Sequence, residues 1–196
     1  MQVVLASGNA HKAKEISAAL PRNLELILQS DLEIVSAEET GLTFLENALI
    51  KARNAAACSN LPALADDSGI SVDALGGAPG IYSARYAGVD ASDRQNLEKL
   101  LTELGDHDNR KARFHCVLVF LRTPDDPTPL VAEGSWHGQI AHSASGEAGF
   151  GYDPVFYLPD RACTAAELNM TEKNEISHRG IALRQMTKLL RERYPA

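Results

Sequence analysis

The chain has no long apolar run and few cysteines. None of its apolar stretches approaches the roughly 20 residues that a membrane-spanning helix needs. Its N-terminus also lacks the charged region and apolar core of a secretory signal. We therefore expect a cytoplasmic protein with no membrane partner. The cysteines at positions 58, 116 and 163 match neither a disulfide framework nor a metal-binding spacing, so we expect reduced and mostly buried thiols.

Two common catalytic signatures and an excess of basic residues are also missing. The sequence contains no Gly-x-Ser-x-Gly elbow and no Walker-type Gly-Lys-Ser/Thr, which argues against a serine hydrolase and a P-loop nucleotidase. The formal net charge is −7, whereas binding to duplex nucleic acid rewards a broad basic face. We expect no nucleic-acid partner. A small anionic ligand is compatible with this charge, because a few converging cations are enough locally.

What is present indicates an α/β protein. With 196 residues, of which 44% are hydrophobic and 23% charged, the chain is long enough for a proper core. We expect a single two-lobed domain over residues 1–196, because no repeat or clear linker interrupts it. Apolar patterns predict strands at residues 3–6, 24–28, 61–65, 114–121, 130–136 and 155–158. Helices are predicted from about Lys12 to a stop at Pro21, at 43–58 and 96–104, and after Ser177.

Turn and capping signals sharpen this prediction. Thr43 and Glu46 form a capping-box pattern, as do Thr164 and Glu167. The strands at 114–121 and 130–136 flank a Pro/Asp-rich turn, which predicts an antiparallel hairpin and therefore a mixed sheet flanked by helices. At that turn we expect a solvated tip at Asp125–Asp126, and Trp136 is expected to be a packed strand residue.

The first candidate site follows the first predicted strand. Val3–Ala6 breaks into Ser7-Gly8-Asn9-Ala10-His11-Lys12 and then a helical pattern. A strand that feeds a Gly-containing turn and a helix N-terminus presents backbone N–H groups to a phosphate, and Lys12 would reach the same anion. An ordinary β–turn–α connection explains these six residues equally well.

The second candidate site is Asp66-Asp67-Ser68-Gly69, which we place at a strand end. Side chains at the carboxyl ends of strands face the crevice where α/β proteins bind ligands. Because neighbouring strand residues point to opposite faces, only one of the two aspartates is expected to face it. Together with Glu38 or Glu39 it would bind a Mg²⁺ that bridges substrate phosphates. A solvated Asx-turn is the alternative.

Two further candidates lie in the second half of the chain. In Gly149–Pro154 the glycines allow close backbone approach to a flat ligand, and Phe150 or Tyr152 could stack on a nucleobase; a tight turn with an aromatic anchor is the alternative. Ser177-His178-Arg179 begins a predicted helix, where N–H groups and the arginine fork suit an anion or a carbonyl-bearing ring edge. Lys173 lies nearby in the sequence.

In their order and spacing these motifs resemble the inosine triphosphate pyrophosphatase family in its bacterial form. The similarity covers residues 2–190 and includes a Gly/Pro-rich loop at 76–86. The motifs that carry it are Ser7-Gly8-Asn9-x-x-Lys12, Glu38-Glu39-Thr40-Gly41, Asp66-Asp67-Ser68-Gly69, Phe150-Gly151-Tyr152-Asp153 and Ser177-His178-Arg179. Ser7 stands where threonine is frequent, which retains the hydroxyl.

The resemblance implies a homodimeric enzyme with an elongated mixed sheet and a cleft between two lobes. Such an enzyme cleaves ITP, dITP and XTP to the monophosphate and pyrophosphate with Mg²⁺. By motif match the metal ligands are Glu38 and Asp67, and Asp67 is also the general base, with Ser68 beside it. The phosphates are assigned to Ser7, Gly8, Asn9, Ala10, His11 and Lys12, and the purine nucleotide to Phe150, Gly151, Tyr152, Asp153, Lys173, His178 and Arg179. Lys51 is included on helix register alone, because it lies four residues after Asn47 and shares a face of the predicted helix with it.

Selectivity and turnover need separate arguments. Donors near His178 and Arg179 would donate to the C6 carbonyl of hypoxanthine or xanthine and leave the amino group of adenine unpaired; guanine shares that carbonyl. A nucleotide-binding regulator without turnover, or a phosphatase of sugar or nucleoside phosphates, is the alternative function. The carboxylates at Glu38 and Asp67 favour an enzyme, because a binder gains little from a hydrolytic metal site.

Overall fold

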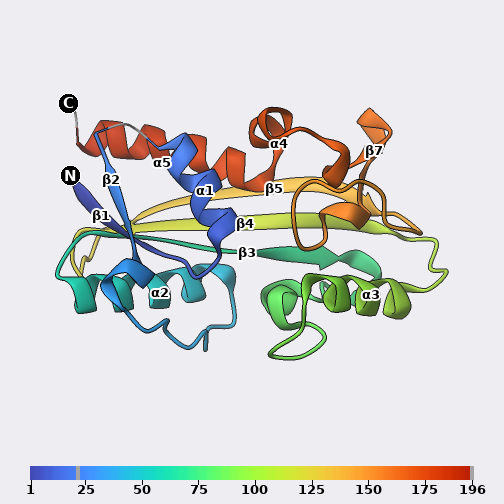
Figure 1. Cartoon of the computed structure of the whole chain (residues 1–196), viewed down its shortest axis with the longest axis horizontal. Helices are drawn as coiled ribbons and strands as arrows, with labels where there is room; N and C mark the ends of the chain where they lie inside the picture. Colours follow the sequence, from blue (N-terminus) through green and yellow to red (C-terminus); the bar gives the residue numbers. More distant parts are fainter. Residues whose placement is uncertain (21–22, 195–196) are drawn as a thin grey trace. The chain divides into compact units, whose positions relative to one another are not determined.

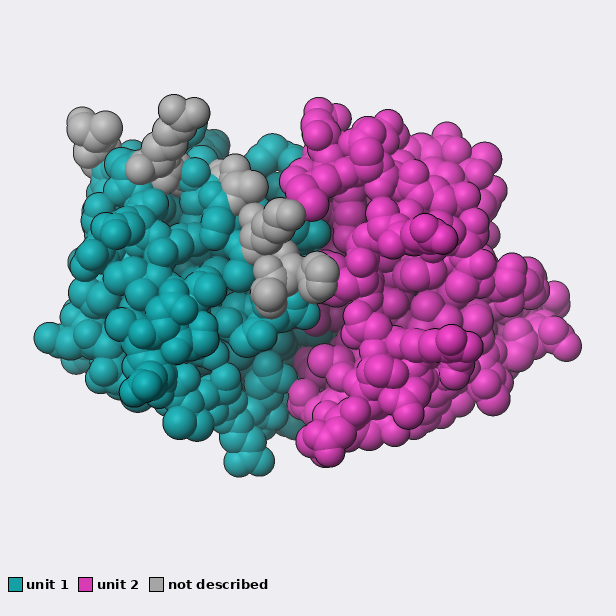
Figure 2. Space-filling view, in the orientation of Figure 1, with its two compact units in different colours: residues 1–67, 116–134, 179–196 teal, residues 68–115, 135–178 magenta. Residues whose placement is uncertain are grey.

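The computed structural model describes residues 1–20 and 23–194, and in the first helix only the backbone of Ala10, His11, Lys14, Ala18 and Ala19. The helix stop predicted at Pro21 lies outside the described residues. The chain forms two compact units, each described here by itself (Figure 2). Unit 1 comprises residues 1–67, 116–134 and 179–196, and unit 2 comprises residues 68–115 and 135–178.

A seven-stranded sheet organises the described part of the chain (Figure 1). Its strand order is β2-β1-β3-β4-β5-β6-β7. The strands are β1 (Gln2–Ala6), β2 (Glu25–Leu28), β3 (Ala63–Val72), β4 (Lys111–Leu121), β5 (Leu130–Ile140), β6 (Phe156–Leu158) and β7 (Cys163–Thr164). β1 pairs in parallel with β2 and β3, and β6 pairs antiparallel with β5 and β7. The predicted mixed sheet is confirmed.

The α-helices are α1 (Ala10–Ala19), α2 (Phe44–Ser59), α3 (Asp93–Leu104), α4 (Met170–Ile176) and α5 (His178–Arg193). Short 3₁₀ turns, η1 to η6, occupy Gln29–Leu32, Asp73–Leu75, Gly80–Arg85, Asp153–Val155, Pro159–Arg161 and Ala165–Glu167. The predicted α/β fold, with a sheet flanked by helices, is confirmed. Among the described residues, no helix combines the length and apolar character needed to cross a membrane.

The capping patterns do what the sequence predicts. The Thr43 hydroxyl accepts the Glu46 N–H, and the Glu46 carboxylate accepts the N–H of Leu42, so α2 begins at Phe44. The box at Thr164 and Glu167 also forms, but it starts only the short 3₁₀ turn η6. Local chemistry fixes where these elements begin, whereas their length depends on the apolar stripe that follows.

In unit 1, helices cover both faces of the strands. α1 and α5 lie on one face and α2 on the other (Figure 1). Side chains alternate along β1, so this strand packs against the helices on both faces. Leu5 lies in the cluster with Ile16 and Met186, whereas Val4 packs with the alanines of α2. These alanines, Ala48, Ala52, Ala55 and Ala56, are fully buried. Their small size brings α2 close to the strands.

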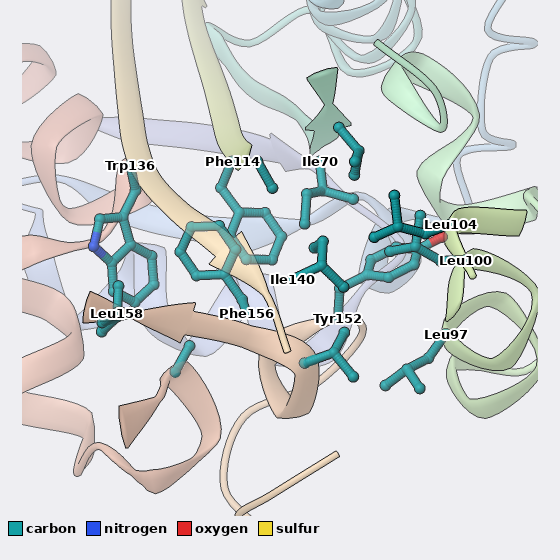
Figure 3. Packing of buried hydrophobic residues seen from close by; sticks show 14 of the residues in the cluster. Ile70, Leu97, Leu100, Leu104, Phe114, Trp136, Ile140, Tyr152, Phe156 and Leu158 are labelled. Carbon is teal, nitrogen blue, oxygen red and sulfur yellow. The ribbon is translucent and has the colours of Figure 1, made fainter. Parts of the chain in front are cut away.

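The core of unit 2 contains a group of aromatic rings among aliphatic side chains (Figure 3). The Phe156 ring lies 4.5 Å from that of Phe114 and 5.0 Å from that of Trp136, measured between centroids. Leu100 and Leu104 of α3 belong to the same cluster. Trp136 is buried, as predicted. Tilted aromatic pairs at these distances add attraction beyond the area they bury, so this cluster is a rigid support for the neighbouring loops.

The structure corrects the prediction that Asp66–Gly69 follows a strand end. β3 runs from Ala63 to Val72 and passes through these four residues. Turn-forming residue types stay extended here because their surroundings supply partners: lysines and an arginine neutralise the carboxylates. Gly69 fits because a Cβ there would lie 2.5 Å from the carbonyl oxygen of Gly80. The prediction that a candidate site directly follows a strand is right for β1, which ends at Ala6, opposite Ala65 of β3.

Two further expectations are wrong. Asp126 is not a solvated tip: its carboxylate is buried and accepts two hydrogen bonds of 2.8 Å from the Arg122 guanidinium and one of 3.0 Å from the Thr128 N–H. The thiols are not mostly buried, since only Cys116 is, while Cys58 is exposed and Cys163 is half-buried. Burial raises the pKa of the Cys116 thiol to about 12, which makes it unreactive.

We predict that Asp126→Asn lowers the melting temperature at pH 7 by about 2–4 °C, the size of a 1 kcal/mol loss in a chain of this length. Hydrogen bonds from Arg122 hold the pKa of Asp126 well below its ordinary value. The carboxylate therefore stabilises the fold above the unfolded-state pKa of about 4, and this contribution is lost as the pH falls towards the folded-state pKa.

Thermal unfolding at pH 7, 5, 4 and 3 measures the effect. The difference between wild type and variant should shrink on acidification. Asp125→Asn is the matched control, because Asp125 is exposed in the same turn. A difference that stays constant across this pH range would show that the charge of Asp126 does not stabilise the turn.

Candidate active site

Asp66 and Asp67 point to opposite faces of β3. The Asp66 carboxylate contacts Lys12 of α1 and Arg179 of α5, whereas the Asp67 carboxylate contacts Lys51 of α2. Helices α1 and α5 cover one face and α2 the other (Figure 1). The expected period-two alternation is confirmed, and it gives the two neighbouring carboxylates different partners.

Around Asp66, unit 1 buries a network of opposite charges. The Asp66 Oδ2 atom lies 3.2 Å from the Lys12 ammonium and 3.5 Å from the Arg179 guanidinium. Arg179 also donates a 2.5 Å hydrogen bond to Glu15. Burial alone would raise the pKa of Asp66, but attraction to Lys12, Arg179 and Lys51 outweighs it and holds this pKa well below the ordinary value. Asp66 is therefore a permanent anion whose role is to hold cations in place.

The turn before α1 is shaped by its own polar side chains. The Ser7 hydroxyl accepts the N–H of Asn9, and the Asn9 side chain accepts the N–H of Lys12. Asn9 thus caps the helix, while Gly8 is exposed with open space around it. This is the predicted strand–turn–helix arrangement, with Lys12 in the first turn. The predicted contributions of the side chains at positions 10 and 11 lie outside what the structure describes.

On the other face of β3, one lysine joins two carboxylates. The Lys51 ammonium lies 2.7 Å from Asp67 Oδ1 and 2.9 Å from Glu39 Oε1. Burial raises the pKa of Asp67, and the opposing attraction of Lys51 does not fully offset it. Burial would lower the pKa of Lys51, but the neighbouring carboxylates reverse this and raise it. Lys51 therefore remains charged and holds the two acids together.

This acidic face fits a divalent cation. Asp67 Oδ2 is buried and has no hydrogen-bond partner among the described residues, which leaves a carboxylate oxygen for a ligand. The Glu39 carboxylate lies beside the same lysine, whereas the Glu38 side chain is exposed. Across the described residues, no three His, Cys, Asp or Glu side chains form a ready-made metal cluster. The donor set suits Mg²⁺, which uses one or two carboxylates together with substrate phosphates.

Unit 2 contains a loop that presents Phe150. Asp153 is buried and accepts hydrogen bonds from the Lys173 ammonium at 2.6 Å and from the Phe150 N–H at 2.9 Å. The Lys173 ammonium also lies 5.0 Å from the centroid of the half-buried Phe150 ring. At Gly149, which has φ +79°, a Cβ would clash with the Asp153 carboxylate. The loop conformation therefore depends on glycine at that position.

The remaining predicted residues of unit 2 have supporting positions. Tyr152 is buried in the core and donates a 2.8 Å hydrogen bond to the carbonyl of Ser83. This placement leaves Phe150 as the aromatic side chain of the loop that a ligand can reach. The buried His178 ring stacks on Phe114 with 4.7 Å between centroids. Ser68, the first residue of unit 2, is half-buried on β3.

Sequence reasoning missed two residues of this arrangement. Glu15 lies three residues after Lys12 on α1, so helix spacing brings the two side chains to one face. The sequence did not indicate Glu15 because its partner, Arg179, lies 164 residues away. Asn47 is fully buried and its side-chain oxygen accepts the N–H of Gly41 at 2.8 Å. This bond fixes the end of the segment that carries Glu39.

Comparisons with known proteins show which family this chain is similar to. The profile of the Ham1 family matches residues 3–189. A curated relative from Photorhabdus laumondii, named dITP/XTP pyrophosphatase, is 58% identical over 193 residues, which are 97% of this chain and 98% of the relative. A relative of the same name from Shigella flexneri is also 58% identical, with the same coverage.

Solved structures show the same fold. The structure of a HAM1 protein from Coxiella burnetii matches with a TM-score of 0.92 and 48% identity, over 98% of this chain and 99% of that one. A nucleoside-triphosphatase / dITP/XTP pyrophosphatase from Mycobacterium abscessus matches with a TM-score of 0.73 and 37% identity over the full length of both chains.

We predict that Asp66→Asn destabilises the protein by about 3–5 kcal/mol, because removing one member of a buried ion pair leaves its cationic partners uncompensated. Equilibrium unfolding in urea measures this change. Asp31→Asn removes an exposed acid of the same unit and should change the free energy of unfolding little. A loss below about 1 kcal/mol for Asp66→Asn, the ordinary value of an exposed pair, would contradict the burial argument.

Proposed function

Because the chain belongs to the Ham1 family, we propose that it hydrolyses the non-standard purine nucleoside triphosphates ITP, dITP and XTP to the nucleoside monophosphate and pyrophosphate. Relatives at 58% identity over nearly the whole chain have the name of this activity. One structural observation supports the proposal most directly. On one face of β3 the Asp66 carboxylate pairs with two cations, and on the other face Asp67 has a buried carboxylate oxygen without a hydrogen bond among the described residues.

The triphosphate is assigned to unit 1. The turn Ser7–Lys12 offers backbone N–H groups at a helix N-terminus, where anions are stabilised. Lys12 and Arg179 are fixed by Asp66 and offset the charge of the phosphates. Phosphoryl transfer depends mainly on positioning and on electrostatic stabilisation, and cations that are already fixed provide both. Arg179, which the sequence assigned to the purine nucleotide, is therefore assigned to its phosphate part.

Mg²⁺ is assigned to Asp67 with one acid of the Glu38–Glu39 pair. Both are candidates from the sequence; the Glu39 carboxylate lies beside Lys51 and Asp67, and this supports Glu39. A Mg²⁺ held there would supply positive charge to offset the charge of the leaving pyrophosphate. Lys51 holds the two acids in place by its hydrogen bonds.

Asp67 is assigned as the general base. Lys51 uses only Oδ1 of this buried carboxylate, so Oδ2 is the oxygen available for both roles. One of its lone pairs would bind the cation and the other would accept the proton of the attacking water. Ser68, the next residue, is assigned to the substrate.

The purine is assigned to unit 2. Phe150 stacks on the base, and Lys173, held by Asp153, and His178, held by the aromatic core, face its polar edge. Donors there match the C6 carbonyl of hypoxanthine and xanthine, and they oppose the amino group of adenine. Gly151 and Tyr152 shape the loop.

The setting of this activity follows from the sequence and the family resemblance. We propose a homodimer that acts on free nucleotides in the cytoplasm and removes non-standard purines from the nucleotide pool. The net charge of −7 is consistent with a small-molecule substrate rather than a nucleic-acid partner.

We predict that Asp67→Asn lowers kcat for ITP by about 100-fold or more, on the scale of general-base contributions. Release of pyrophosphate in the presence of Mg²⁺ measures this rate. Asp73→Asn, which changes an exposed acid directly after β3, is the control and should retain wild-type turnover. Turnover of Asp67→Asn within tenfold of wild type would remove Asp67 from the mechanism.

We also predict that kcat/KM for ITP and XTP exceeds that for ATP by about tenfold to 100-fold, because an unpaired buried amino group costs about 1–3 kcal/mol. The same pyrophosphate assay with each purine triphosphate checks this. Equal values would contradict a selective pocket. The products also test the alternatives, since a regulator releases nothing and a phosphatase releases orthophosphate.

A further inference from the structure

A hydrogen bond links the Phe150 loop to a helix that is distant in the sequence. The Gly151 N–H donates to Asp93 Oδ2 at 2.7 Å. Asp93 is the first residue of α3 and lies 58 positions before Gly151. No motif in the sequence singles out Asp93, and both residues belong to unit 2.

This bond completes the control of the backbone at Phe150. The peptide group before Phe150 is held because its N–H donates to Asp153. The peptide group after Phe150 is held at both ends: its Gly151 N–H donates to Asp93 at 2.7 Å, and its Phe150 carbonyl accepts the longer, 3.2 Å hydrogen bond of the Asp153 N–H. With both flanking peptide planes fixed, φ and ψ of Phe150 are fixed as well, and so is the direction in which its side chain leaves the backbone.

Asp93 is itself held in place. Ser92 and Gln95 form a complete capping box at the start of α3. The buried Asn96 accepts the N–H of Ala87 at 2.7 Å and donates to the carbonyl of Ala84 at 3.1 Å. The helix start is therefore anchored independently of the Phe150 loop. Gly151 adopts φ +61°, a conformation that few other residues tolerate and that an external acceptor helps to maintain.

We propose that Asp93 is a positioning residue for base recognition: it orients the Phe150 ring through the Gly151 N–H and thereby sets the affinity for the purine. This inference rests on the proposed function. Asp93 itself touches neither the base nor the phosphates. Its loss should weaken the binding of a substrate that has a base, while the phosphate chemistry in unit 1 continues.

The test compares three variants in the Mg²⁺-dependent pyrophosphate assay with ITP. Asp93→Ala should raise KM by about threefold to tenfold, the value of one ordinary hydrogen bond, with kcat within about twofold of wild type. Asp93→Asn should restore the wild-type KM, because its amide oxygen accepts the same N–H. Gln95→Ala weakens the capping box but keeps the Asp93 acceptor, so it should leave KM unchanged.

A competitor without a base separates orientation of Phe150 from general damage. Inorganic tripolyphosphate should inhibit wild type and Asp93→Ala with the same Ki, whereas a merely loosened structure would weaken its binding too. An unchanged KM for Asp93→Ala, or an equal rise for Gln95→Ala, would overturn the proposal.

Amide hydrogen exchange keeps this test separate from the proposed activity. Exchange of the Gly151 N–H should accelerate in Asp93→Ala and not in Gln95→Ala, whatever the enzyme hydrolyses. Unchanged exchange would overturn the positioning role. A wild-type protein that releases no pyrophosphate from ITP would instead overturn the proposed function.

Discussion

The charge of Asp66 is the constraint on which unit 1 depends. Removing a carboxylate from water costs several kcal/mol unless cations and hydrogen bonds compensate it. Here the compensation comes from Lys12 of α1 and Arg179 of α5, which are far apart in the sequence. The fold must therefore bring α1, β3 and α5 together before Asp66 can remain charged. The same requirement places two cations at the end of β1, next to the turn assigned to the phosphates.

Side chains alternate between the two faces of β3, so the neighbouring Asp66 and Asp67 have different partners. Asp66 is committed to cations on one face, and its pKa is held below the ordinary value. Its neighbour Asp67 points to the other face, where burial raises its pKa and one oxygen lacks a hydrogen bond. Two identical residues thus differ in chemistry because period two gives them different surroundings. The extended strand alone directs the two carboxylates to opposite faces, and no special turn is needed.

Local signals made part of the structure predictable. The Thr43 box started α2 where expected, and the apolar pattern after it continued the helix, with Ala48 and Ala52 on the buried face. The strand through Asp66–Gly69 was not predictable, because these types favour turns and only distant cations make an extended conformation acceptable. Asp126 follows the same logic, since its burial depends on a guanidinium that the sequence does not orient.

For the candidate site, motifs provided candidate residues but not their partners. Arg179 and His178 are neighbours in one motif, yet the Arg179 guanidinium contacts Asp66 and Glu15 in unit 1, whereas the His178 ring stacks in the aromatic core of unit 2. Spacing could not separate these roles, because successive residues at a helix start point about 100° apart and meet different neighbours.

The aromatic rings of unit 2 would give the proposed base pocket the rigidity that discrimination between bases requires. A pocket rejects a mismatched group only when its donors cannot move to relieve the mismatch. His178 is held by stacking on Phe114, and Lys173 is held by the buried Asp153. Both donors are thus fixed by contacts that exist without a ligand. In the proposed pocket, selectivity for a carbonyl over an amino group would depend as much on this supporting packing as on the donors themselves.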